Sequence, residues 1–353
     1  MLFMPLKDDI QKIVINNEEE LMRAKGSSLF ITGICGFLGR YFLEVLTEFN
    51  KNVDQKINLV GVDNLISSGA FGNGIAVGDR DWFSYHQIDV SQLDNEVLSV
   101  AMGCDYLIHA AGIASPAHYK KHPLKTIDVA VTGTRSLLDV AKKEKSKFVF
   151  FSSSEIYGNP PADQIPIREC FKGIVSSTGP RACYDESKRL GETLCSVFNR
   201  EFGVHTSVIR PFNVYGPGMQ RNDYRVIPNF GYALKDGKSL QVYGSGKQTR
   251  TYCYVSDALS GMFKVFFKGL SGHCYNVGTN LDEISALELA ERFIKVSGSK
   301  QEVHIVNYPS NYPSDEPDRR CPNIEKLQGL GYSPEVDISS GLLRFWNFIN
   351  RDL

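Results

Sequence analysis

The stretch TGICGFLGR, which runs from Thr32 to Arg40, decides the fold of this chain of 353 residues. A short apolar run precedes it, and the segment from Phe37 to Phe49 repeats apolar side chains with the period of a helix. Glycines at positions 33, 36 and 39 stand at the turn between the two. Glycine allows a tight strand-to-helix turn and close packing of the helix on the strand. The stretch therefore predicts the first strand–helix unit of an α/β sheet.

Similar apolar runs follow along the chain. The runs SLFIT, NLVGVD, FSYHQID, YLIHAA, KFVFFSS and TSVIRP begin at residues 28, 58, 83, 106, 147 and 206. Short, nearly continuous apolar runs are typical of strands that are covered on both faces of a parallel sheet. Between them lie helical-period segments, such as Leu124–Lys142, with Ile127, Val131, Leu138 and Ala141 on one side. Alternating strands and helices predict an α/β fold with a doubly wound, Rossmann-type parallel sheet.

The composition of the sequence changes after Arg210, where a stretch rich in Gly, Pro, Asn and Tyr begins. We interpret residues 211–253 and 281–353 as a smaller, interleaved C-terminal substrate lobe. Residues 28–210, with 254–280, form the predicted sheet domain. Residues 1–27 are expected to be an appendage, in which Asn17 and Glu20 are spaced to form a helical capping box.

Composition excludes several classes of protein. With 39 basic and 40 acidic residues and no basic run, nucleic acid is not expected as a partner. No apolar stretch approaches the roughly 20 residues that span a bilayer, so no membrane association is expected. The first ten residues lack the apolar run of a signal peptide. The eight cysteines are scattered singly, without zinc spacing. We therefore expect free thiols, no metal and a cytoplasmic protein.

The glycine-rich turn also predicts a dinucleotide site, because a helix N-terminus offers unpaired N–H groups to a pyrophosphate. Asp63 ends the second strand, about 20 residues beyond the turn, where a carboxylate accepts hydrogen bonds from ribose hydroxyls. The next ten residues contain no Lys or Arg, which favours NAD over NADP. Asp89 is placed to meet the adenine, although a simple turn role fits it nearly as well. The expected NAD-binding residues are Gly33, Gly36, Phe37, Leu38, Gly39, Asp63, Asn64, Asp89, Val90, Ala110, Ala111, Tyr184 and Lys188.

Tyr184 and Lys188 form a Y-x-x-x-K pair, which a helix would place on one face. A lysine ammonium stabilises phenolate, so the tyrosine can act as a general base near neutral pH. Ser153 and Glu155 end the fifth strand, at the edge where open α/β sheets bind ligands. Ser153 is the candidate to hold a substrate alcohol beside Tyr184. Glu155 either points into the same cleft or is a solvent-exposed loop carboxylate. His109 is expected to be a hydrogen-bonded structural histidine.

These motifs together resemble the extended short-chain dehydrogenase/reductase family of nucleotide-sugar epimerases and dehydratases. Within it, the sequence is most similar to the UDP-glucuronate decarboxylases (UDP-xylose synthases). The resemblance runs from about Ser28 to the C-terminus. The segments that carry it are ASPAHYKKHPLKTI (Ala114–Ile127), GPRACYDESKR (Gly179–Arg189), NDYRVIPNF (Asn222–Phe230) and VYGSGKQTRTYCYVSD (Val242–Asp257).

The resemblance implies roles for particular residues. Ser153, Glu155, Tyr184 and Lys188 match the catalytic positions. Arg320 and Asn213 match positions that hold the nucleotide's phosphates. Without the resemblance, a surface role for Arg320 is about as plausible. Arg181 could neutralise a substrate carboxylate or be structural. The expected substrate-binding residues are Ser115, Tyr119, Asn213, Tyr243, Gln248, Arg250 and Arg320, with Arg250 contacting the substrate and Tyr243 near the nucleobase.

Three positions depart from the family pattern. Ala130 replaces an asparagine behind the active site, Gly218 replaces an arginine after Y-G-P, and Tyr224 replaces the glycine of N-D-G-R. The last two lie in the expected substrate lobe, and they leave the exact sugar open.

The expected function is NAD-dependent modification of a nucleotide sugar through a transient 4-ketone, first of all decarboxylation of UDP-glucuronate to UDP-xylose. A nucleotide-sugar 4,6-dehydratase is the first alternative and a 4-epimerase the second. A non-catalytic NAD-binding regulator is disfavoured by the intact Ser153, Tyr184 and Lys188, because a pure binder has no use for a phenolate. Family members pair through two helices, so a homodimer is expected through the helices near Leu124–Lys142 and Tyr184–Phe198.

Overall fold

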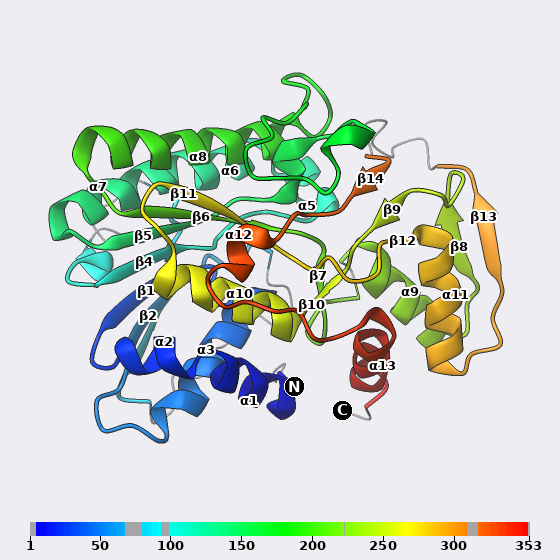
Figure 1. Cartoon of the computed structure of the whole chain (residues 1–353), viewed down its shortest axis with the longest axis horizontal. Helices are drawn as coiled ribbons and strands as arrows, with labels where there is room; N and C mark the ends of the chain where they lie inside the picture. The colour runs from blue at the N-terminus through cyan, green and yellow to red at the C-terminus, as the bar shows by residue number, and fades with distance from the viewer. Residues whose placement is uncertain (1–4, 68–79, 93–98, 222, 309–316, 352–353) are drawn as a thin grey trace.

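The computed structural model describes residues 5–67, 80–92, 99–221, 223–308 and 317–351. A sheet of seven parallel strands forms its centre, in the order β11-β6-β5-β4-β1-β2-β3 (Figure 1). The predicted Rossmann-type sheet is confirmed, and each of the six predicted strands is present. The seventh, β11, was not predicted as a strand. The strands are β1 (Ser28–Thr32), β2 (Asn58–Val62), β3 (Phe83–His86), β4 (Tyr106–His109), β5 (Lys147–Phe151), β6 (Thr206–Pro211) and β11 (His273–Val277).

Helices cover both faces of this sheet (Figure 1). Side chains alternate along each strand, so Leu29 and Ile31 of β1 join one apolar core and Phe30 joins the other. Burial on both faces explains why the strands read as continuous apolar runs. Helices α3 (Phe37–Asn50) and α10 (Val255–Lys268) cover the first face, and α7 (Thr134–Glu144) and α8 (Ala182–Phe202) cover the second.

The segment predicted as one helix from Leu124 to Lys142 is interrupted. It consists of α6 (Pro123–Asp128), a π-helical turn (Val129–Gly133) and α7, and the short helix α5 (Pro116–Lys121) precedes it. A π turn holds an extra residue and rotates the face that follows it. The residues before and after the turn therefore do not share one face: Ile127, which precedes it, is 37% exposed, whereas Leu138 and Ala141, which follow it, pack inside as predicted.

A smaller lobe lies beside the carboxyl ends of the strands (Figure 1). The ring of Phe345 on α13 packs against Phe293 on α11 and Tyr232 on α9, which gives the lobe its own apolar centre. Its elements are β7 (Val214–Tyr215), α9 (Val226–Lys235), β8 (Leu240–Tyr243), β9 (Thr249–Arg250), β10 (Cys253–Tyr254), β12 (Ile284–Ser285), α11 (Ala286–Ser297), β13 (Val303–Val306), β14 (Arg319–Arg320) and α13 (Ile338–Ile349). The short helix α12 (Glu325–Gln328) packs instead on β11 and α10 of the sheet domain. Short 3-10 turns occur at Ser154–Tyr157 and Ala162–Gln164.

The N-terminal residues form helices α1 (Lys7–Asn16) and α2 (Glu18–Arg23), and α1 packs against α3 and α10. The predicted capping box is wrong, although α2 does begin directly after Asn17. The Asn17 amide donates to the carbonyl oxygen of Ile13 at 2.8 Å. Glu20 instead pairs with Lys264 at 2.7 Å and Lys268 at 2.6 Å. A buried carboxylate is stabilised by two ammonium partners more than by one backbone N–H.

Candidate active site

The glycine-rich turn brings backbone close to backbone. Gly33 has φ of +78°, and a Cβ atom there would lie 3.0 Å from the Cα of Ala111. A Cβ at Gly39 would lie 2.4 Å from the carbonyl oxygen of Gly33. Gly36 caps α3 without any side-chain hydrogen bond, so the first N–H groups of the helix are left for a ligand. These residues line a cavity of about 240 Å³ that suits a pyrophosphate at the N-terminus of α3.

Asp63 lines the same cavity, next to the glycine-rich turn. Its carboxylate accepts hydrogen bonds from the N–H of Cys35 at 3.0 Å and the N–H of Leu65 at 2.8 Å. These bonds fix the carboxylate where ribose hydroxyls can donate to it. Part of the segment without Lys or Arg lies outside the described residues. The predicted residues that line the cavity are Gly33, Gly36, Phe37, Leu38, Gly39, Asp63, Asn64, Val90, Ala110 and Ala111.

Asp89 lies behind this lining rather than in it. Its carboxylate pairs with Lys125 at 2.6 Å and accepts from the N–H of Ser91 at 3.0 Å. Burial opposes the charged form, but Lys125 and Ser91 hold the pKa of Asp89 below its usual value. The hydrogen bond from Ser91 fits the turn role considered for Asp89, and its contact with the adenine stays a prediction.

Tyr184, Lys188 and Ser153 meet where the N-terminal part of α8 crosses the end of β5. Lys188 Nζ donates to the carbonyl oxygen of Phe151 at 2.7 Å, and the Tyr184 phenol is hydrogen-bonded to Ser153. All three side chains line a second cavity of about 980 Å³. Burial lowers the pKa of Lys188 to about 8 and raises the pKa of Tyr184, an effect that the Ser153 hydrogen bond opposes.

His109 is buried behind this pair and is structural, as the sequence predicts. Its Nε2 donates to the carbonyl oxygen of Val129 at 3.0 Å, so its Nδ1 accepts from the hydroxyl of Thr32 at 2.8 Å. Burial and the nearby Lys188 lower the pKa of His109 to about 3. The imidazole is therefore neutral at physiological pH.

Glu155 faces the larger cavity between two arginines. Arg320 Nη2 lies 3.0 Å from Glu155 Oε2, and the Arg320 Nη1 and Arg181 Nη2 atoms also contact the carboxylate. Arg181 is 7% exposed and Arg320 is 3% exposed. Of the two readings of Glu155, the structure shows the one inside the cleft. Likewise, Arg320 is not a surface residue.

The predicted substrate residues divide between the two cavities. Tyr119 stacks on Tyr184 with 5.5 Å between ring centroids. Arg250 donates to the carbonyl oxygens of Pro317 at 2.6 Å and Thr249 at 2.8 Å, which are uncharged acceptors. Of the predicted substrate-binding residues, Ser115 lines the smaller cavity. Those that line the larger cavity are Tyr119, Asn213, Tyr243, Gln248, Arg250 and Arg320.

The three departures from the family pattern take different places. Ala130 lies in the π turn, where its carbonyl oxygen accepts from the Thr134 hydroxyl at 2.6 Å. Gly218 has φ of +101° and lines the smaller cavity, so its backbone conformation favours glycine. Tyr224 is 61% exposed and lines the larger cavity.

Arg225 was not predicted as a site residue, although it lies within the matching stretch that starts at Asn222. It lines both cavities, at the place where they adjoin. Asp223 holds it, with Arg225 Nε 2.8 Å from Asp223 Oδ1. The positive charge of Arg225 acts to lower the pKa of Tyr184, against the larger effect of burial. It was not singled out in the sequence because Tyr224 departs from the N-D-G-R pattern, whereas Arg225 matches that pattern.

Comparison with known proteins agrees with this geometry. Residues 29–278 match the model of the NAD dependent epimerase/dehydratase family. UDP-glucuronic acid decarboxylase 1 of Danio rerio is 32% identical over 99% of this chain and 80% of its own length. UDP-glucuronic acid decarboxylase 3 of Arabidopsis thaliana is 34% identical over 89% of this chain and 86% of its own.

Solved structures share the fold. A dTDP-glucose 4,6-dehydratase from Bacillus anthracis in complex with NAD superposes with a TM-score of 0.78, at 22% identity over 92% of this chain and 97% of its own. A UDP-glucuronic acid 4-epimerase from Bacillus cereus, in complex with UDP-glucuronic acid and NAD, gives 0.78 at 24% identity over 92% of this chain and 99% of its own. Since the matched region includes the seven strands, the glycine-rich turn, the tyrosine–lysine pair and most of the lining of both cavities, this chain is an enzyme of the NAD-dependent epimerase/dehydratase family, with NAD as its cofactor.

Proposed function

We propose that this enzyme decarboxylates UDP-glucuronate to UDP-xylose. The observation that carries the proposal is the charge of the larger cavity. The described residues that line it include six cationic side chains and one carboxylate, that of Glu155. The six are Arg181, Lys188, Arg225, Lys238, Arg250 and Arg320, of which Arg225 pairs with Asp223 and Arg181 with Asp185 just outside the lining. A nucleotide diphosphate that also bears a sugar carboxylate matches this excess of positive charge better than a neutral hexose does. The names of the curated relatives support the same substrate.

The chemistry begins at the sugar's C4 hydroxyl. The glycine-rich turn and Asp63 would hold NAD, which would supply the hydride acceptor for C4 and the donor for its later reduction. Tyr184 removes the hydroxyl proton, and Ser153 holds the alcohol by a hydrogen bond. Because burial raises the pKa of Tyr184, the phenolate needs nearby positive charge, which Arg225 and Arg181 supply. Lys188, whose Nζ lies 6.0 Å from the centroid of the Tyr184 ring, adds a further positive charge.

The 4-ketone that results is β to the C6 carboxylate. The C5–C6 bond breaks, its electron pair moves into the carbonyl, and carbon dioxide leaves. C5 then takes up a proton before C4 is reduced, so the reaction has no net redox change. Arg181 and Arg320 already bind one carboxylate, Glu155, and are placed to orient the substrate's carboxylate as well. Glu155 is the described carboxyl group of this cavity that can deliver or accept the C5 proton.

A 4,6-dehydratase is the second candidate, and the position of Glu155 is what favours it. Once C4 is a ketone, a carboxylate that faces the sugar cavity can remove the C5 proton of a hexose and pass it to the C6 hydroxyl, which leaves as water. Incubation of the purified enzyme with UDP-glucuronate, UDP-glucose and dTDP-glucose, followed by mass spectrometry, separates the two. Loss of carbon dioxide from UDP-glucuronate is the expected result. Loss of water from a hexose nucleotide, with UDP-glucuronate unchanged, would overturn the proposal.

We further propose a homodimer that pairs through α6 and α8. These helices pack on each other, and Leu124 on α6 and Leu190 on α8 are 74% and 46% exposed. Exposed apolar side chains on adjacent helices favour a partner surface. Light scattering of the purified protein tests this, and a monomer mass would contradict it. A cytoplasmic location is also proposed, and the eight free cysteines support it.

A further inference from the structure

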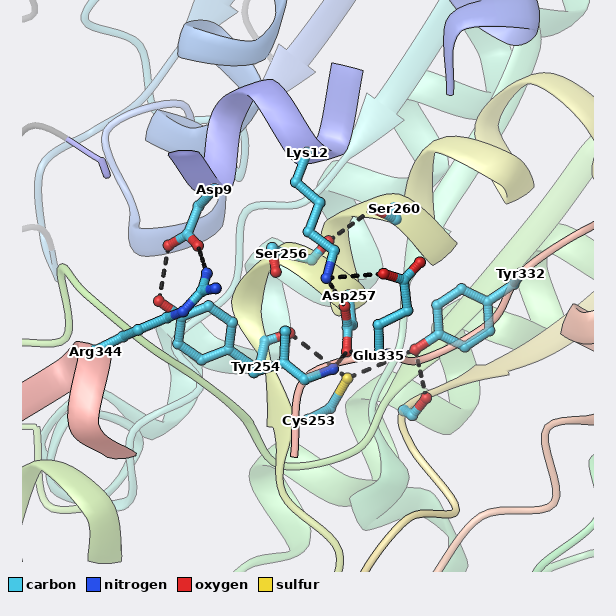
Figure 2. A network of polar contacts seen from close by, with 12 residues as sticks. Asp9, Lys12, Cys253, Tyr254, Ser256, Asp257, Ser260, Tyr332, Glu335 and Arg344 are labelled. Carbon is cyan, nitrogen blue, oxygen red and sulfur yellow. Dashed lines mark hydrogen bonds and ion pairs between the residues drawn. The ribbon is translucent and has the colours of Figure 1, made fainter. Parts of the chain in front are cut away.

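Helix α1 lies at the seam between the sheet domain and the lobe, outside the region that the family model matches. Ile10 and Ile13 are buried and anchor α1 on α3 and α10 of the sheet domain. Helix α13 of the lobe lies on the opposite side of these contacts from the sheet domain. Figure 2 shows α1 above the polar contacts that join these elements. The function proposed above uses none of them.

Asp9 is the centre of these contacts. Its side chain is fully buried, at 0% exposed. Tyr254 Oη donates to Oδ2 at 2.7 Å, and Arg344 Nη1 donates to Oδ1 at 2.8 Å (Figure 2). Burial raises the pKa of Asp9, whereas both partners act to lower it. One carboxylate therefore joins β10 to α13 and holds both against the N-terminal helix.

Lys12 makes a second bridge one turn along α1. Its Nζ lies 3.1 Å from Glu335 and 3.8 Å from Asp257. Asp257 lies in the first turn of α10 and accepts from the N–H groups of Glu335 and Val336, both at 2.8 Å. The chain that leads into α13 is thus attached to the sheet domain on the same side of α1 (Figure 2).

The strand that Asp9 holds continues into the wall of the larger cavity. Tyr254 lies in β10, which pairs with β7, and the rings of Tyr254 and Tyr215 meet edge to face with 5.6 Å between centroids. The β7 residues Val214 and Tyr215 line the cavity, and so does Tyr252, just before β10. A shift of Tyr254 would therefore move two walls of the substrate site, whereas the glycine-rich turn makes none of these contacts.

We propose that Asp9 is a positioning residue for the nucleotide-sugar site: through Tyr254 and Arg344 it fixes the lobe at the angle that the substrate requires. The inference rests on the proposed function only in requiring that a nucleotide sugar occupies the larger cavity. It predicts that a residue outside the family-matched region controls affinity for the substrate and not for NAD.

The test measures binding of UDP and of NAD to the full chain by calorimetry. Asp9→Asn preserves the shape of the side chain and removes its charge. We expect its Kd for UDP to rise roughly fivefold, within the range by which residues of a coupled network alter binding at a remote site. Its Kd for NAD should stay at the wild-type value. Tyr254→Phe, which removes one hydroxyl, should give the same pattern more weakly and covers the case that Asp9→Asn does not fold.

Asp8→Asn is the matched control, because Asp8 is the exposed neighbour of Asp9 on the same helix. It should bind both ligands as the wild type does. Unchanged UDP affinity in Asp9→Asn and Tyr254→Phe would overturn the inference, and so would equal losses for UDP and NAD. If the wild type binds dTDP in place of UDP, the proposed substrate is wrong, and the same comparison with dTDP decides the inference. A wild type that binds neither nucleotide overturns both.

Discussion

Lys188 is hydrogen-bonded to Phe151, at 2.7 Å from its Nζ to the backbone carbonyl oxygen. This bond ties α8 to the last residue of β5, two residues before Ser153. It therefore fixes the phenol of Tyr184 relative to the hydroxyl of Ser153, which is proposed to hold the substrate alcohol. The base and the hydroxyl come from elements far apart in sequence, and one lysine holds them in register.

Tyr184→Phe should abolish turnover and preserve NAD binding. The phenol is the proposed base, and positioned proton transfer contributes roughly a hundredfold to ten-thousandfold to rate. The ring itself remains, so its stacking on Tyr119 is retained. Product formation measured by chromatography, with NAD affinity measured in parallel, checks both statements. Turnover near the wild-type rate would remove Tyr184 from the mechanism.

Arg225→Ala should shift the acid limb of the pH–rate profile to higher pH. The positive charge of Arg225 lowers the pKa of Tyr184, so its loss raises that pKa and delays formation of phenolate as pH increases. Arg225→Lys keeps the charge and should restore most of the profile. A drop in rate with no shift along the pH axis would instead indicate a role in binding alone.

Glu155→Gln should destabilise the substrate-free enzyme. Arg181 and Arg320 would lose their shared carboxylate while both remain nearly buried. Loss of one partner of a buried polar group typically costs about 1–3 kcal/mol, and the ion pair that Arg181 keeps with Asp185 at 3.6 Å holds the cost toward the lower value. UDP-glucuronate should recover more of the lost thermal stability than UDP-glucose, because it supplies a carboxylate. Glu325→Gln, whose side chain is 69% exposed beside Arg168, is the control and should leave stability unchanged.

The sheet and the catalytic pair could be predicted from the sequence because each follows from local pattern. The six predicted strands are buried on both faces, and Gly33 and Gly39 stand where only glycine fits. The π turn could not be predicted, since Ile127 repeats with the helical period and only tertiary packing decides where the extra residue goes.

Long-range pairing explains what else was missed. Asn17 and Glu20 have the spacing of a cap, but the lysines that capture Glu20 come more than 240 residues later in the chain. The two arginines that contact Glu155 also come from separate elements, so no local spacing in the sequence predicts that they lie beside it. Asp9 is another such case. It follows two charged residues, Lys7 and Asp8, that are exposed, and nothing in the local sequence indicates that the Asp9 carboxylate is buried.

Gly39→Ala should abolish NAD binding with little effect on UDP binding. The new Cβ would lie 2.4 Å from the carbonyl oxygen of Gly33 and 2.7 Å from the Cα of Ile34, both backbone atoms that cannot rotate away. The turn must open, and the first N–H groups of α3 then leave the pyrophosphate position. Gly329→Ala is the control, because Gly329 lines neither cavity. The atom nearest to its new Cβ would be the carbonyl oxygen of Lys326, at 3.3 Å. Calorimetry with NAD and UDP separates the two sites. Retained NAD affinity in Gly39→Ala would show that the pyrophosphate does not bind at this turn.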